Sequence, residues 1–129
     1  MSLLKPAALK PRTAADLRSA QGLLVVCLCA EWCDTCREFR TAFGRIADAD
    51  PAGIYVWLDI EDESALIGDL DIENFPTLAV FRRGQPVFFG VTLLQEAVVQ
   101  RTLAALRAED ARAVPVPEAV AALPDMLGS

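Results

Sequence analysis

Two cysteines separated by two residues, Cys33 and Cys36, are the side chains of this sequence with the most distinctive chemistry. They follow an apolar run over residues 23–29, which predicts a buried strand. The cysteines lie at the start of a segment, residues 34–48, in which large apolar side chains recur every three or four positions, and this spacing predicts a helix. The N–H groups and the macrodipole at a helix start stabilise a thiolate, so Cys33 is predicted to be a nucleophile. Cys36, one turn later, is close enough to close a disulfide with Cys33, as thiol–disulfide exchange requires.

The segment Trp32-Cys33-Asp34-Thr35-Cys36-Arg37 resembles the active site of the thioredoxin family, whose usual form is Trp-Cys-Gly-Pro-Cys-Lys. Two later segments match in the family's order. Asn74-Phe75-Pro76-Thr77-Leu78 resembles the loop that carries the family's cis-proline, and residues 81–87 resemble its terminal hairpin. The resemblance covers residues 13–108. It implies the α/β thioredoxin fold, a mixed sheet of four to five strands flanked by helices on both faces.

The resemblance also assigns roles to single residues. Cys33 is implied as the nucleophile and Cys36 as the resolving cysteine, and their redox-active disulfide takes the place of any cofactor. The family binds substrate backbone at the residue before its proline, so a phenyl group at this position suggests an apolar substrate segment. The residues implied in substrate binding are Trp32, Phe75, Pro76 and Gly90.

Several positions depart from the thioredoxin pattern. Asp34 follows the nucleophile, and its charge disfavours the neighbouring thiolate. Cys27 stands where thioredoxins have a buried aspartate that accepts the proton of the second cysteine. Trp57 stands where they often have a buried lysine, and Cys29 stands where an aromatic residue flanks the site. Asp34, Cys27 and Cys29 are therefore predicted to modulate the chemistry. We interpret Cys27 as a small apolar filler, with a third redox thiol as the alternative, and either role leaves the proton without this acceptor.

Composition excludes several classes of function. A chain of 129 residues forms one domain, and a net charge of −6 without basic clusters argues against nucleic acid and anionic membranes as partners. No apolar run approaches the ~20 residues of a transmembrane helix. Four cysteines within ten residues cannot staple distant segments, so a secreted disulfide framework is not expected. Residues 22–30 could imitate a signal peptide, but Val26 is too large for the cleavage position. We expect a cytoplasmic monomer.

The predicted boundaries are an N-terminal arm over 1–12, a thioredoxin-like domain over 13–110 and a Pro-containing tail over 111–129. Within the tail, residues 118–123 could form one or two helical turns, on a segment that is either packed on the domain or disordered, with a partner-binding motif as the less favoured alternative. Predicted helices cover residues 13–20, 34–48, 63–70 and a last one to about 108, which a capping box at Thr92-Leu93-Leu94-Gln95 would open. Predicted strands cover residues 23–29, 54–60, 77–81 and 86–89.

A run of acids marks the middle of the chain. No lysine or arginine occurs between Arg45 and Arg82, and the segment is predicted to form a solvated face, or else to favour basic partners. The acids are Asp48, Asp50, Asp59, Glu61, Asp62, Glu63, Asp69, Asp71 and Glu73.

Three functions are compatible with these patterns. The first is a protein-disulfide oxidoreductase, working as a reductase in cell redox homeostasis, with protein disulfides as substrates and a thiol reductase upstream. The second is a binding or assembly module on a thioredoxin scaffold with vestigial or regulatory cysteines. The third is a metal or iron–sulfur site formed by all four cysteines. It is disfavoured because Cys27 would lie behind the helix, so no metal is expected.

Overall fold

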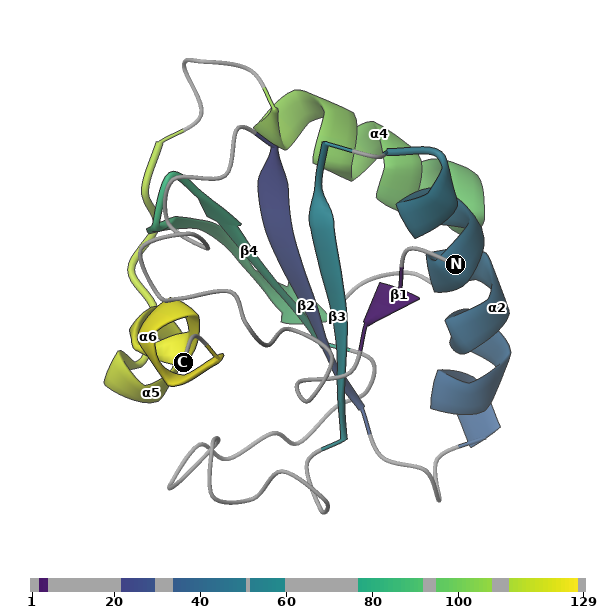
Figure 1. The fold of residues 1–129 in the computed structure, drawn as a ribbon, viewed down its shortest axis with the longest axis horizontal. Helices are drawn as coiled ribbons and strands as arrows, with labels where there is room; N and C mark the ends of the chain where they lie inside the picture. Colours follow the sequence, from purple (N-terminus) through teal and green to yellow (C-terminus); the bar gives the residue numbers. More distant parts are fainter. Residues whose placement is uncertain are drawn as a thin grey trace.

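The computed structural model describes residues 3–4, 22–29, 34–50, 52–59, 77–91, 95–107 and 112–127. These residues form a five-stranded mixed sheet in the order β1-β3-β2-β4-β5 (Figure 1). Strands β1, β3 and β2 are parallel, and β4 and β5 extend the sheet as an antiparallel pair. The strands are β1 (Leu3–Leu4), β2 (Leu23–Cys29), β3 (Ile54–Asp59), β4 (Thr77–Arg82) and β5 (Gln85–Val91). The predicted mixed α/β sheet is confirmed, and part of the N-terminal arm supplies its fifth strand.

The helix that follows β2 has the predicted limits. Helix α2 (Asp34–Asp48) crosses over the sheet to β3, and this connection makes the neighbouring strands parallel. Its buried side chains recur at helical spacing, which gives α2 one apolar face toward the sheet. They are Cys36, Phe39, Ala42, Phe43, Gly44, Ile46 and Ala47.

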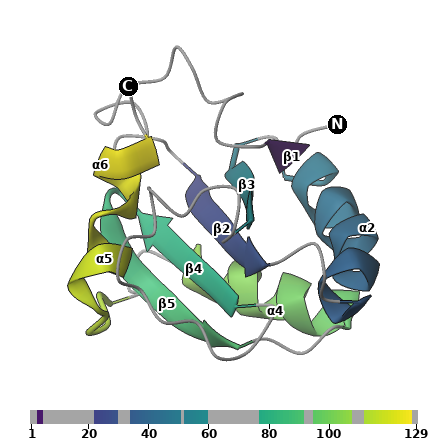
Figure 2. The ribbon, with the colours of Figure 1, turned by 90° about the horizontal axis from the view of Figure 1, so that it is seen from below.

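The sheet divides the core into two layers. Helices α2 and α4 (Glu96–Leu106) cover one face, where the odd-numbered residues of β2 are buried together with Val99 and Leu103 of α4. Across the sheet lie α5 (Glu118–Ala121) and α6 (Leu123–Leu127), against the even-numbered residues of β2 (Figures 1 and 2). Because successive side chains of a strand point to opposite faces, one apolar strand supplies both layers. The prediction of helices on both faces is confirmed.

The C-terminal segment is packed on the domain. Val120, Leu123 and Leu127 are buried against the sheet, and the Val114 N–H donates a hydrogen bond of 2.8 Å to the Pro86 carbonyl of β5. Of the two alternatives for the tail, the structure therefore supports packing over disorder for residues 112–127. The helices predicted over 13–20 and 63–70 lie outside the described residues.

Three elements, β4, β5 and α4, differ from prediction at their boundaries. The hairpin strands meet at a tighter turn, in which only Arg83 and Gly84 lie outside the ladder, both with positive φ (53° and 81°). Such a turn matches the twist of the two strands, which can therefore pair up to the turn itself. Helix α4 starts at Glu96, later than predicted. Its N-cap, Gln95, makes no side-chain capping hydrogen bond, and the other residues of the predicted capping box lie outside the described part.

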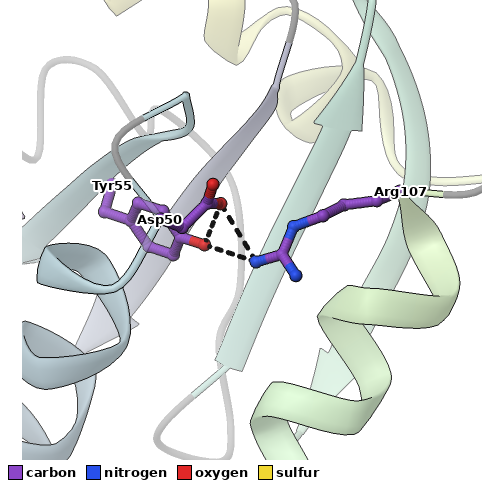
Figure 3. Close-up of polar contacts among 3 residues, drawn as sticks. All are labelled: Asp50, Tyr55 and Arg107. Carbon is purple, nitrogen blue, oxygen red and sulfur yellow. Dashed lines mark hydrogen bonds and ion pairs between the residues drawn. The ribbon is translucent and has the colours of Figure 1, made fainter.

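A polar triad ties the end of α4 to the connection between α2 and β3 (Figure 3). The Tyr55 hydroxyl donates to Asp50 Oδ2 at 2.7 Å, and Arg107 Nη2 donates to the same oxygen at 3.0 Å and to Tyr55 Oη at 3.2 Å. Burial and the bond to Asp50 raise the pKa of Tyr55 to about 12. Burial disfavours the charged guanidinium, but the bonds to Tyr55 and Asp50 outweigh it, so the pKa of Arg107 is also raised. Asp50 is thus engaged in the fold and does not belong to the predicted solvated face.

Candidate functional site

The site lies at the edge of the sheet where two parallel strands end. Strand β2 ends at Cys29, β3 ends at Asp59, and α2 begins at Asp34 on the same side (lower part of Figure 1). The carboxyl ends of parallel strands meet at one edge, and a helix that follows such a strand directs its N–H groups to the same place. This edge therefore combines thiol chemistry with the positive end of a helix.

Cys36 is the predicted catalytic residue that the structure describes. It lies in the first turn of α2, its side chain is 0% exposed, and it shares a core cluster with Cys27 and Cys29. A buried position agrees with the predicted role of a resolving cysteine, which attacks only a neighbouring sulfur. The other predicted residues of the reacting surface lie outside the described part of the chain, and their roles stay predictions. They are Trp32, Cys33, Phe75 and Pro76.

Asp34 does not act as an isolated charge at the start of α2. Its carboxylate forms an ion pair with Arg37, one turn later, and both side chains are largely exposed (83% and 64%). The guanidinium thus partly offsets the negative charge of Asp34, which follows the predicted nucleophile in the sequence. Sequence reasoning treated Asp34 alone, although a spacing of three in a helix is a known signal for such pairs.

Cys27 and Cys29 lie on one face of β2, as the alternation of the strand predicts. Both are fully buried under α2, and their Sγ atoms are 3.5 Å apart. The two thiols thus fill the layer between sheet and helix behind Cys36.

Trp57 occupies the position next to Cys27 on β3, where the two residues are register partners. Its indole is buried, packs at 6.3 Å from the ring of Phe43, and lies 5.5 Å beneath the guanidinium carbon of Arg40. In place of the thioredoxin aspartate and lysine, this chain therefore has a thiol beside an indole capped by a surface cation.

Asp59 is a second acid, after Asp50, that does not belong to the predicted solvated face. Its strand position makes it the register partner of Cys29, and its side chain is 8% exposed, so the assignment of this acid to a solvated face is wrong. The position of Asp59 within the apolar strand predicted over residues 54–60 could have signalled this, because alternation puts it on the same face as Tyr55 and Trp57. Asp48, by contrast, is exposed as predicted.

Gly90 lies near the end of β5 and pairs with Leu78 of β4. Among the described atoms, a Cβ at this position would meet only the Phe88 ring, at an ordinary 3.8 Å. Packing within the described structure therefore does not require glycine here, and the predicted role in substrate binding stays a prediction.

Two features absent from the described residues bear on other classes of function. No three His, Cys, Asp or Glu side chains in this part of the chain are arranged to hold a metal ion. None of the described helices combines the length and the apolar character needed to cross a bilayer. The four-cysteine metal site includes Cys33, which lies outside the described residues.

Comparison with known proteins gives the family. The family model described as Thioredoxin matches residues 10–109. Putative thioredoxin 2 of Streptomyces coelicolor is 30% identical over 81 residues, which are 63% of this chain and 60% of that protein. Protein disulfide-isomerase A4 of Bos taurus is 30% identical over 76 residues, which are 56% of this chain and only 12% of the relative.

Solved structures agree on the fold. A thioredoxin h from poplar superposes with a TM-score of 0.67 at 14% identity, over 82% of this chain and 96% of the other. A mutant thioredoxin from Halobacterium salinarum gives a TM-score of 0.63 at 19% identity, over 88% of this chain and 95% of the other. The predicted thioredoxin fold is confirmed, and because the family model covers most of its length, the chain belongs to the thioredoxin family.

Proposed function

We propose that the chain is a thiol–disulfide oxidoreductase that reduces protein disulfides, with Cys33 as the nucleophile and Cys36 as the resolving cysteine. Cys33 attacks a substrate disulfide and forms a mixed disulfide. Cys36 then attacks the Cys33 sulfur, which releases the reduced substrate and leaves the Cys33–Cys36 disulfide. An upstream thiol reductase restores the dithiol, and no cofactor beyond the disulfide is needed. We place this activity in the cytoplasm and in a monomer.

The observation that carries the proposal is the placement of Cys36. A buried thiol in the first turn of α2, beside the carboxyl ends of β2 and β3, is shielded from solvent, which suits a group whose reaction partner would be a sulfur at the helix start. Membership of the thioredoxin family supports the same chemistry. Trp32, Phe75, Pro76 and Gly90 would form the surface that receives the substrate backbone.

The test is turnover and trapping. The reduced protein is expected to reduce a model protein disulfide such as insulin in the presence of dithiothreitol, and Cys33→Ser is expected to abolish this activity. Cys36→Ser should accumulate a mixed disulfide through Cys33, visible as a mass shift that reductant removes. The double variant, which keeps the same fold but lacks both thiols, is the matched control and should trap nothing.

A binding or assembly module gives a different result. In that case Cys33→Ser and the unchanged protein would have the same low activity, and Cys36→Ser would trap no partner. Preferential alkylation of Cys36 over Cys33 in the reduced protein near neutral pH would contradict the assignment of the nucleophile.

A further inference from the structure

Resolution of the mixed disulfide requires Cys36 to lose a proton, and the protein must provide a place for it. A thiolate is the attacking species, and the thiol is buried in an apolar cluster, where no water of the bulk solvent reaches it directly. At position 27, where a carboxylate would lie beneath this thiol by resemblance, the chain has a cysteine. A nearby carboxylate elsewhere in the layer would serve the same purpose.

Asp59 is a carboxylate in this layer. It is 8% exposed, it ends β3 at the edge where α2 begins, and its Cα is the register partner of Cys29. Neighbouring strands are ~4.8 Å apart, so the side chains of Cys29 and Asp59 leave the same face of the sheet as near neighbours. Asp59 therefore lies on the strand next to that of position 27, and two residues nearer to the edge where the strands end.

The contacts that Tyr55 and Trp57 of β3 make with α2 can be extended by one step to infer which helical turn lies opposite Asp59. The Tyr55 ring is 5.7 Å from the Phe43 ring, and the Trp57 ring is 6.3 Å from Phe43 and 5.5 Å from the guanidinium carbon of Arg40. Two residues forward along β3 thus correspond to about one turn back along α2. The strand advances ~6.6 Å in two residues and the helix ~5.4 Å per turn, so the steps match. The next step leads from Trp57 to Asp59 on the strand and from Arg40 to Cys36 on the helix.

The described charged and titratable groups around Asp59 are few. Strand β2 contributes Cys27 and Cys29, and β3 contributes Tyr55, whose hydroxyl is bound to Asp50 at the opposite end of the strand. From α2 come Cys36, the Arg37 guanidinium paired with Asp34, and the Arg40 guanidinium stacked on Trp57. Strand β1 contributes only Leu3 and Leu4. Of the two described carboxylates at this edge, Asp34 is largely exposed and paired with Arg37, whereas Asp59 is buried.

We propose that Asp59 accepts the proton of Cys36 when Cys36 attacks the mixed disulfide. This inference rests on the proposed function. The Cys36 S–H bond breaks and its proton passes to the Asp59 carboxylate, while the Cys36 sulfur forms a bond to the Cys33 sulfur. The bond between Cys33 and the substrate sulfur breaks, and the substrate leaves as a thiolate, which is the reduced product. The Asp59 carboxyl then returns its proton to this thiolate or to solvent.

The test separates the two sulfur attacks with dithiobis-nitrobenzoate as the model disulfide. Attack by Cys33 releases one coloured thionitrobenzoate anion, and attack by Cys36 on the resulting mixed disulfide releases the second. Stopped-flow absorbance resolves the two releases over a range of pH. The variants are Asp59→Asn, Asp59→Glu and, as the matched control, Asp48→Asn, which changes an exposed acid at the far end of α2.

In Asp59→Asn the first release is expected at the wild-type rate. The second should be slower by roughly 100-fold or more near pH 7, the contribution typical of a positioned base. The difference should shrink as pH rises, because solvent then removes the thiol proton unaided. Asp59→Glu should keep a second release that varies little with pH, and Asp48→Asn should match the wild type in both releases.

Two outcomes overturn the inference in distinguishable ways. A normal first release followed by a second release in Asp59→Asn equal to wild type at every pH overturns the role of Asp59 alone. No Cys33-dependent first release in the wild type overturns the proposed function, and the inference with it. If Asp59→Asn shows no cooperative urea transition, it is not folded, and Asp59→Glu becomes the deciding variant. A rate of the second release in Asp59→Glu that rises with pH across the range in which thiols ionise would exclude the carboxylate as the proton acceptor.

Discussion

The triad of Asp50, Tyr55 and Arg107 allows a prediction that can be read from one side chain. Tyr55 is the single tyrosine of the chain, so the ultraviolet absorbance of tyrosinate reports on it alone. Burial and the Asp50 acceptor raise its pKa from 10.0 to about 12, whereas the Arg107 guanidinium acts in the opposite direction. Asp50→Asn is therefore expected to move the titration midpoint down, and Arg107→Gln to move it up.

The same shift gives a pH-dependent contribution to stability. Because the folded protein holds the phenolic proton more tightly than the unfolded chain, the contribution is complete below pH ~10 and is lost as pH rises toward ~12. Two pKa units correspond to ~2.7 kcal/mol, and the partial exposure of Arg107 reduces the expected value to about 1–2 kcal/mol. The difference in unfolding free energy between wild type and Tyr55→Phe should shrink by this amount from about pH 9 to about pH 12.

Absorbance titration and urea unfolding at several pH values measure the two effects, and Tyr55→Phe is the control that should abolish the absorbance change. Shifts of the midpoint in the same direction for Asp50→Asn and Arg107→Gln would refute the assignment of opposite effects. A destabilisation by Tyr55→Phe that stays constant over the alkaline range would refute the linkage.

Three further predictions concern the site and the second layer of the core. Asp34→Asn leaves Arg37 without its acid and should lower the pH midpoint of Cys33 thiolate formation, whereas Arg37→Gln should raise it. Each shift should stay below about one pH unit because both side chains are exposed, and a thiolate titration unchanged in both variants would contradict this. Cys27→Ala should lower the free energy of unfolding, measured with urea, by ~1 kcal/mol or more and leave both thionitrobenzoate releases intact. Loss of turnover in this variant would show instead that Cys27 takes part in the chemistry. Ending the chain after residue 111 uncovers Leu24, Val26 and Leu28. The free energy of unfolding should fall by at least about 2 kcal/mol, and the shortened protein should newly bind an apolar dye. Unchanged stability would mean that α5 and α6 add nothing to the core.

Local sequence patterns were sufficient for the elements around the candidate site. The apolar run 23–29 and the helical spacing over 34–48 predicted β2 and α2 at their observed limits, because burial on one face imposes a period that the sequence carries. The same alternation placed Cys27 and Cys29 on one face of the strand. The start of α4 was predicted less well, since a capping pattern is a weak local preference that the packing of Val99 and Leu103 can override.

What the sequence alone determined is therefore the order of β2, α2, β3, β4, β5 and α4, the family resemblance and the position of Cys36 in the first turn of a helix. The tertiary structure decided which polar groups leave the solvent and what lies across from them. Asp59 looks like one acid among nine in the sequence, and its burial beside Cys29 follows from the pairing of β3 with β2 beneath α2. The packing of α5 and α6 on the second face was likewise decided by contacts between distant segments. A residue's period shows which face of its own element it occupies, but its neighbours on that face come from other parts of the chain, and only the assembled fold brings them together.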